Sequence, residues 1–165
     1  MSAPYLGSNV VEEVQHDGYT LQPPPSRFEP GSPATEAVIG WGAAVDYLSD
    51  LGMDKVEKYC RELGSYARDR VASVEGVKVL GSDRPELRSS IVSFYIQGLE
   101  SHAAARMLNH RANVCVRSGF HCAQPVHELL KSPPSIRVSV HVYNTREDID
   151  ILVEHLALIA SLANT

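Results

Sequence analysis

The chain has 165 residues, enough for a domain with a substantial core, and 44% of them are hydrophobic, which is ordinary for a globular protein. The net charge of −5 without any basic stripe argues against a nucleic-acid partner, and no apolar run approaches the roughly 20 residues of a membrane span. The first residues do not resemble a signal peptide, and three cysteines leave at least one unpaired, which favours reduced thiols in a cytoplasm.

Residues 1–32 differ in character from the rest of the chain. They contain the proline run Q-P-P-P-S at 22–26 and show little hydrophobic periodicity, with only residues 10–14 reading as a short strand. The sequence therefore predicts an extended N-terminal arm over 1–32, followed by a C-terminal domain over 33–165.

Two helices are predicted at the start of that domain. Ser32 suits the N-cap and Pro33 the first helical position, where its missing N–H is not needed. Apolar residues then recur at steps of three and four, which predicts a helix over 33–51. A second amphipathic stretch predicts another helix over 54–75.

Strand and helix patterns alternate through the remainder of the chain. The sequence predicts strands over 77–80, 90–96, 113–117 and 135–142, and helices over 101–110, 126–130 and from residue 146 onwards. Thr145 is expected to cap the last helix, with Asp148 in a capping-box position. These elements predict an α+β fold in which helices cover one face of a small, mostly antiparallel sheet.

The stretch R-S-G-F-H-C-A-Q-P at 117–125 contains the most reactive candidate, Cys122. A thiol acts as a nucleophile in its thiolate form, which nearby cations favour, and Arg117 and His121 flank this cysteine. Gly119 gives the loop conformational freedom. The alternative is a cysteine that serves as a small core residue. The polar, flexible surroundings of Cys122 favour the nucleophilic role over the core role.

The other cysteines and the histidines are candidate metal ligands. Cys115, His121, Cys122 and His127 are close in sequence, but there is no C-x-x-C pair and Cys115 falls in a predicted strand. We therefore predict no metal site. Cys60 and Cys115 are predicted to pack in the core, because apolar residues surround them.

Two further residues have a structural and a functional interpretation. Ser32, at the start of a helix, either caps that helix or contributes to a phosphate site at the helix N-terminus. Arg137 faces the opposite side of its strand from Ile136 and Val138. It either binds a carboxylate through its planar guanidinium or is a solvated strand residue.

Three motifs resemble the C-terminal part of one enzyme group. R-F-E-P-G-S-P at 27–33, V-R-S-G-F-H-C-A-Q-P at 116–125 and R-V-S-V-H-V-Y-N-T at 137–145 are similar to motifs of group II cysteine desulfurases and selenocysteine lyases. These are pyridoxal-phosphate enzymes of the class V aminotransferase family that mobilise sulfur for iron–sulfur cluster assembly. The resemblance covers nearly the whole chain. It implies the α+β small domain of fold-type I pyridoxal-phosphate enzymes.

The resemblance also implies roles for individual residues. Cys122 matches the cysteine that takes sulfur from L-cysteine as a persulfide, with release of alanine. Arg137 matches the arginine that holds the substrate carboxylate, and Arg117, His121 and Asn144 belong with it to the substrate pocket.

A cofactor role is implied at the start of the domain. Ser32, with Gly31, matches residues that reach the cofactor phosphate of the other subunit in a dimer, although Ser32 replaces the family's threonine. Phe120 stands where the family often has histidine, which puts a polar role there in doubt.

The family's cofactor lysine has no counterpart in this sequence. The lysines at 55, 58, 78 and 131 lack the sequence context of the residue that forms the Schiff base. We therefore expect a truncated desulfurase that binds no pyridoxal phosphate covalently by itself. It would be inactive without a large-domain half or a parent enzyme chain, so whether the chain alone is an enzyme stays open.

Partners and alternatives follow from this expectation. Without a large domain, Val10, Val11 and Trp41 would be exposed, which predicts a homo-oligomer. A sulfur-acceptor protein is a further expected partner. A non-catalytic sulfur-carrier or partner-binding module and an inert remnant remain alternatives, and the sequence does not separate sulfur from selenium as the substrate element.

Overall fold

The computed structural model describes Ala3 and residues 5–163 and divides into two compact units. One unit comprises residues 1–50 and the other residues 51–165. The division falls one residue before the end of the first long helix, whereas the sequence placed it after residue 32. Residues 1, 2 and 4 of the predicted arm lie outside the described residues.

The N-terminal unit contains a β-hairpin within the predicted arm. Strand β1 (Val11–Gln15) agrees with the predicted strand to within one residue and pairs antiparallel with β2 (Gly18–Leu21). His16 and Asp17 form the two-residue turn, because Gln15 pairs with Gly18, and the sequence did not predict this hairpin. Val10 is fully buried beside the hairpin, so the expectation that it is exposed was wrong.

Helix α1 (Thr35–Leu51) starts two residues later than predicted. Its first helical amide bond runs from Val38 N–H to the Ala34 carbonyl, which makes Ala34 the capping position. Ser32 therefore does not cap this helix. Ser32 lies two residues before that position, and the described side-chain hydrogen bonds include none from Ser32 to the first helical turn.

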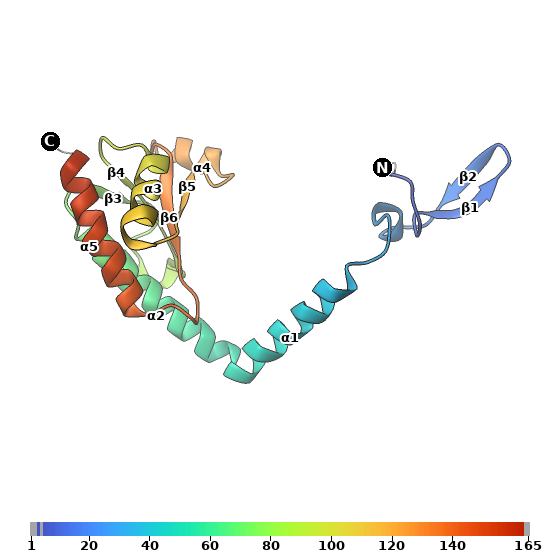
Figure 1. The fold of residues 1–165 in the computed structure, drawn as a ribbon, viewed down its shortest axis with the longest axis horizontal. Coiled ribbons are helices and arrows are strands. Elements are labelled where there is room, and N and C mark those ends of the chain that lie inside the picture. The colour runs from blue at the N-terminus through green and yellow to red at the C-terminus, as the bar shows by residue number, and fades with distance from the viewer. Residues whose placement is uncertain (1–2, 4, 164–165) are drawn as a thin grey trace. The chain divides into compact units, whose positions relative to one another are not determined.

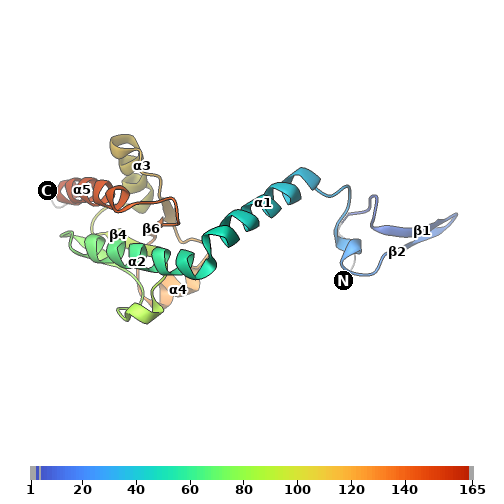
Figure 2. The same ribbon diagram turned by 90° about the horizontal axis from the view of Figure 1, so that it is seen from below.

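The C-terminal unit is an α+β sandwich, as predicted (Figures 1 and 2). In chain order it contains α2 (Met53–Ala72), β3 (Val77–Val79), the 3₁₀ helix η2 (Pro85–Leu87), β4 (Ile91–Ile96), α3 (Ser101–Ala112), β5 (Arg117–Gly119), α4 (Gln124–Leu129), β6 (Ser135–Ser139) and α5 (Arg146–Ala163). The four strands follow the order β3-β4-β6-β5, and all neighbours are antiparallel. The predicted strand over 113–117 is displaced, because hydrogen bonding to β6 begins only at Arg117.

Helices α2, α3 and α5 cover one face of this sheet (Figure 1). Alternate strand residues point into the core that these helices share, among them Val92, Phe94 and Ile96 of β4 and Ile136 and Val138 of β6. This two-residue period is what a half-buried strand requires. The opposite face of the sheet lacks such a helical layer among the described elements.

Helix α5 begins with the predicted capping box. Asp148 N–H donates to Thr145 Oγ1 at 3.3 Å, and Thr145 N–H donates to Asp148 Oδ2 at 3.0 Å. The helix then buries a stripe that includes Leu152, Leu156 and Ile159. Of the helices that the structure describes, none has the length and apolarity to cross a bilayer.

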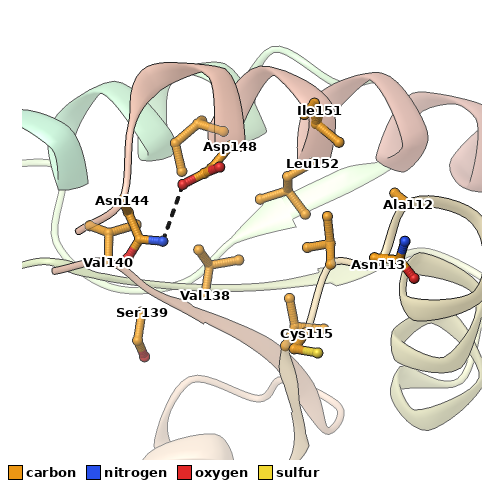
Figure 3. A pocket seen from close by; sticks show the side chains of 13 residues that line it. Ala112, Asn113, Cys115, Val138, Ser139, Val140, Asn144, Asp148, Ile151 and Leu152 are labelled. Atoms are coloured by element: carbon orange, nitrogen blue, oxygen red, sulfur yellow. Dashed lines mark hydrogen bonds between the residues drawn. The ribbon is translucent and has the colours of Figure 1, made fainter.

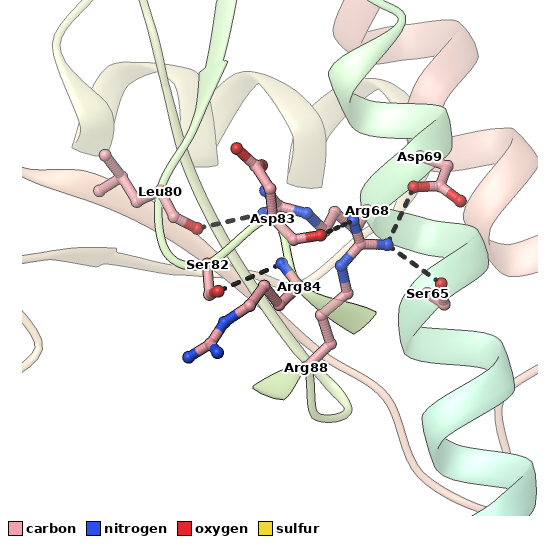
Figure 4. A network of polar contacts seen from close by, with 8 residues as sticks. All are labelled: Ser65, Arg68, Asp69, Leu80, Ser82, Asp83, Arg84 and Arg88. Atoms are coloured by element: carbon pink, nitrogen blue, oxygen red, sulfur yellow. Dashed lines mark hydrogen bonds and ion pairs between the residues drawn. The ribbon is translucent and has the colours of Figure 1, made fainter. Parts of the chain in front are cut away.

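A polar network fastens the loop between β3 and β4 to helix α2 (Figure 4). Arg68 donates to the Leu80 carbonyl and pairs with Asp83. Arg88 donates to Ser65 Oγ and the Asp83 carbonyl and pairs with Asp69. The two arginine side chains are 12% and 17% exposed, but Asp83 and Asp69 are 96% and 69% exposed, so solvent screens the ion pairs and the bonds to backbone carbonyls contribute most of the attachment. The network therefore holds the loop in one position.

The close contact between α2 and this loop predicts a destabilising substitution. A Cβ at Gly64 would lie 2.3 Å from the backbone oxygen of Ser89, so Gly64→Ala should lower the free energy of unfolding by about 1–3 kcal/mol. Urea denaturation followed by circular dichroism measures the effect. Gly40→Ala is the matched control, because a Cβ there meets nothing within 4 Å. Equal midpoints for the two variants would contradict the assigned contact.

Helix α1 predicts self-association. It has no buried residue, and its apolar side chains include Val38, 57% exposed, and Trp41, 71% exposed. Burying such residues against another copy is favourable, so light scattering should show species larger than the monomer. Trp41→Lys should reduce the larger species, whereas Ala72→Lys at the exposed end of α2 should not. A monodisperse wild-type monomer would refute the prediction.

Candidate functional site

The face of the sheet opposite helices α2, α3 and α5, called the open face, carries a row of polar side chains that runs across the strands. Arg137 of β6 is the register partner of Ser93 on β4 and of Arg117 on β5. Like charges directly opposite one another on neighbouring strands are unfavourable. The described ion pairs include neither arginine. This row therefore presents uncompensated positive charge, which suits binding of an anion.

Cys122 lies in a strained turn directly after β5. Its φ is 59° and that of His121 is 57°, while Ala123 N–H donates to the Phe120 carbonyl at 2.9 Å. Both central residues are thus left-handed, as in a type I′ turn that glycine or asparagine normally occupies. The left-handed conformation costs about 1–2 kcal/mol for each such residue. Strain of this kind is concentrated at functional sites.

The turn places the Cys122 thiol beside the row of arginines. The thiol is exposed, and Nη2 of Arg117 lies 3.9 Å from its sulfur. Arg117 is thus the register partner of Arg137 and contacts the thiol, whereas the described lining of the cleft at Arg137 includes neither Arg117 nor Cys122.

A cleft of about 340 Å³ adjoins Arg137 on the open face. Its polar lining comes from the loop before β4, β4 itself, the cysteine turn, α4 and β6, and comprises Ser89, Ser93, His121, His127, Ser135 and Arg137. Apolar side chains, including Leu80 and Ile91, complete it. The loop that the Arg68–Arg88 network fastens to α2 therefore forms one wall of the cleft.

The imidazole of His121 lines this cleft. Burial lowers its pKa, and the charges of Arg137, His127 and Arg117 lower it further. Its Nε2 lies 3.0 Å from Ser135 Oγ. His127 is buried, with Nδ1 2.9 Å from the Pro133 carbonyl, and it contacts the Phe120 ring edge-on. Neither Ser135 nor His127 was predicted to line the substrate pocket, although Ser135 lies two residues before Arg137 on the same strand face.

Asn144 lies away from the cleft. Its Oδ1 accepts from His141 N–H at 3.0 Å, and its Nδ2 donates to Asp148 at 3.3 Å. It lines a second cavity of about 330 Å³ between the β6 end and α5 (Figure 3). Asn144 therefore orders the turn after β6 in this structure and does not face Arg137.

Cys115 lines the same second cavity and is exposed, so its predicted core position was wrong (Figure 3). The cause is the displaced strand: residues 113–116 leave the β6 ladder, and their side chains no longer follow its alternation. Cys60 is buried, as predicted.

The candidate phosphate-binding residues lie in the N-terminal unit. Ser32 is exposed and, together with Gly31, lines a cavity of about 650 Å³. The Gly31 N–H donates to the Ser8 carbonyl, so it is already engaged, and the Glu29 carboxylate lines the same cavity. The Ser32 hydroxyl shares this cavity with the polar side chains of Asn9, Gln22 and Ser26.

The cleft does not by itself fit pyridoxal phosphate. That cofactor needs a lysine amine for its covalent link and a charged partner for its ring nitrogen. The described lining of the cleft contains neither a lysine nor a carboxylate, and Lys78 lies on the edge strand β3, two strands from Arg137. Nor do the described residues gather three or more His, Cys, Asp or Glu side chains where a metal ion could bind.

The family model described as Aminotransferase class-V matches residues 1–152. The chain belongs to the class V aminotransferase family. It is 39% identical over 151 residues to a probable cysteine desulfurase of Halalkalibacterium halodurans, a match that covers 92% of this chain and 36% of that protein. A cysteine desulfurase of Haloferax volcanii is 36% identical over 152 residues and is covered to 35%.

Solved structures of this family agree with the fold. The apo cysteine desulfurase of Thermococcus onnurineus matches with a TM-score of 0.81 and 32% identity, over 96% of this chain and 39% of that chain. The S-sulfonic acid form of the cysteine desulfurase CsdA of Escherichia coli matches with a TM-score of 0.81 and 31% identity, over 98% and 39%. The resemblance inferred from the motifs is confirmed, and the chain spans well under half the length of these relatives.

The burial of the three thiols predicts their order of alkylation. Burial raises the pKa of Cys60 and shields it from reagents, whereas Cys115 and Cys122 are exposed. Iodoacetamide should therefore modify Cys115 and Cys122 in the folded chain, and Cys60 only after denaturation. Peptide mass spectrometry with and without urea measures this order. Modification of Cys60 at the rate of the other two would contradict the fold around α2.

Proposed function

We propose that this chain carries the sulfur-accepting site of a cysteine desulfurase. The observation that carries the proposal is the exposed Cys122 thiol beside Arg117, in a row that continues to Arg137. Cys122 sulfur attacks the sulfur of bound L-cysteine as a thiolate. An S–S bond forms while the substrate's carbon–sulfur bond breaks, its electron pair stays on carbon, and that carbon takes up a proton to give alanine.

Each side chain has a distinct role in the proposal. Arg137 holds the substrate carboxylate, because a guanidinium matches a carboxylate with two parallel hydrogen bonds. Arg117 places positive charge beside the Cys122 sulfur, which favours the anionic nucleophile. The strained turn keeps the thiol exposed, so that the persulfide can pass to a sulfur-acceptor protein.

Activation of the substrate must come from outside the described cleft. When a carbon–sulfur bond breaks and its electron pair stays on carbon, another group must accept that negative charge. In this family pyridoxal phosphate is the group that does so. We propose that a large-domain segment or partner polypeptide supplies the cofactor lysine, and that the two parts together form the active enzyme in the cytoplasm.

The exposure of Cys122 also supports a second candidate function. An exposed thiol next to a cleft whose described lining contains no lysine suits a sulfur carrier that accepts a persulfide made elsewhere. In that case Arg117 would still stabilise the sulfur anion, whereas Arg137 would have no substrate to hold.

Persulfide mapping tests the proposal. After incubation with a polysulfide donor, mass spectrometry should find one added sulfur atom on Cys122, and Cys122→Ser should abolish this transferable sulfur. Cys115→Ser is the matched control and should leave it unchanged, because Cys115 is exposed but lies away from the arginine row. Sulfur found on Cys115 in preference to Cys122 would refute the assignment.

The requirement for a partner is tested with L-cysteine as the donor. The chain with pyridoxal phosphate alone should release no sulfide, whereas addition of a large-domain polypeptide should restore Cys122-dependent release. In the restored enzyme, Arg137→Gln should raise KM for L-cysteine at least about tenfold, since it removes a charge-assisted bond to the carboxylate. Unchanged KM would favour the sulfur carrier.

A further inference from the structure

Strand β5, which carries Arg117 and leads into the cysteine turn, is held by the sheet along one edge. It is three residues long, lies at the end of the strand order, and pairs within the four-stranded sheet with β6 alone. An unfavourable turn conformation persists only where the surrounding structure enforces it. A short edge strand that continues into such a turn therefore needs a further attachment from outside the sheet.

Helix α3 provides that attachment through His102. The helix packs against β5, and Nδ1 of His102 lies 2.7 Å from Ser118 Oγ, which is hydrogen-bond distance. The same imidazole ring lies against the next residue, because a Cβ at Gly119 would be 3.4 Å from its Cε1 and 3.7 Å from its Nε2. One side chain thus contacts both residues that join Arg117 to the cysteine turn.

The start of α3 holds His102 itself in place. The carboxylate of Glu100 caps the helix, and its two oxygens accept from His102 N–H and Ala103 N–H, each at 2.8 Å. The bond from His102 N–H in particular lowers the pKa of Glu100, so the cap is ionised at neutral pH. Ala104 and Leu108 of the same helix are fully buried in the core. The imidazole therefore projects from an anchored helix.

We propose that His102 is a positioning residue for Arg117 and Cys122. Its bond to Ser118 and its ring contact with Gly119 fix the end of β5, which keeps the Arg117 guanidinium beside the Cys122 sulfur. Without this attachment the end of β5 moves more freely, and Arg117 spends less time at the thiol. The benefit for sulfur transfer rests on the function proposed for Cys122, whereas the effect on the thiol does not.

Alkylation of the folded chain tests the proposal. Peptide mass spectrometry gives the iodoacetamide rates of Cys122 and Cys115 in one sample, and their ratio cancels differences in reagent concentration. His102→Phe keeps an aromatic ring beside Gly119 but removes the bond to Ser118. The ratio of the Cys122 rate to the Cys115 rate should then fall about fivefold, the change expected for loss of one hydrogen bond.

Matched variants separate this bond from general effects on the protein. Ser118→Ala should lower the ratio as much as His102→Phe does, and the two changes together should lower it no further, because both remove the same bond. Ser118→Thr keeps the hydroxyl and should keep the wild-type ratio. His110→Phe makes the same substitution at an exposed position of the same helix and should leave the ratio unchanged.

A double-mutant cycle shows whether His102 acts through Arg117. In Arg117→Gln the guanidinium is absent, so adding His102→Phe should change the ratio less than about twofold. An unchanged ratio in His102→Phe and Ser118→Ala, or a fivefold loss that persists in Arg117→Gln, overturns the proposal. Alkylation does not depend on sulfur transfer, so a chain that passes these tests but forms no persulfide on Cys122 would refute only the proposed function.

Discussion

Strand β6 lies between β4 and β5, and its register determines the geometry of the whole site. Ile136 is fully buried in the helix-covered core, and Arg137 consequently faces the open side. A slip of one residue would exchange these faces and bury an unpaired guanidinium, which is strongly unfavourable. Hydrophobic burial on one face therefore aligns Ser93, Arg137 and Arg117 on the other.

The parts of the site that lie outside the strands are held by polar contacts. The Arg68–Arg88 network anchors the loop that forms one cleft wall, and the bond of His121 to Ser135 anchors the cysteine turn to β6. Both attachments connect a loop to a regular element of the same unit. The rigid sandwich thus supplies the free energy that keeps an unfavourable turn conformation in place.

The sequence allowed prediction of the elements that bury an apolar stripe, because periodicity reports burial directly. The core of the sandwich, the capping box of Thr145 and the outward position of Arg137 were all predicted correctly. The hairpin in the arm, the start of α1 and the exposure of Cys115 were not, because they depend on turn geometry and on where a strand leaves its ladder. The contacts of His121 and His127 arise from tertiary packing, which no local pattern encodes.

The left-handed conformation of Cys122 also has an evolutionary consequence. Glycine adopts such a backbone without a steric penalty, so a cysteine-to-glycine change at this position would remove the thiol and relieve strain at once. Selection for stability and selection for the thiol therefore act in opposite directions on one codon. In a lineage that no longer needed the sulfur chemistry, this turn would be among the first places where glycine or asparagine accumulated.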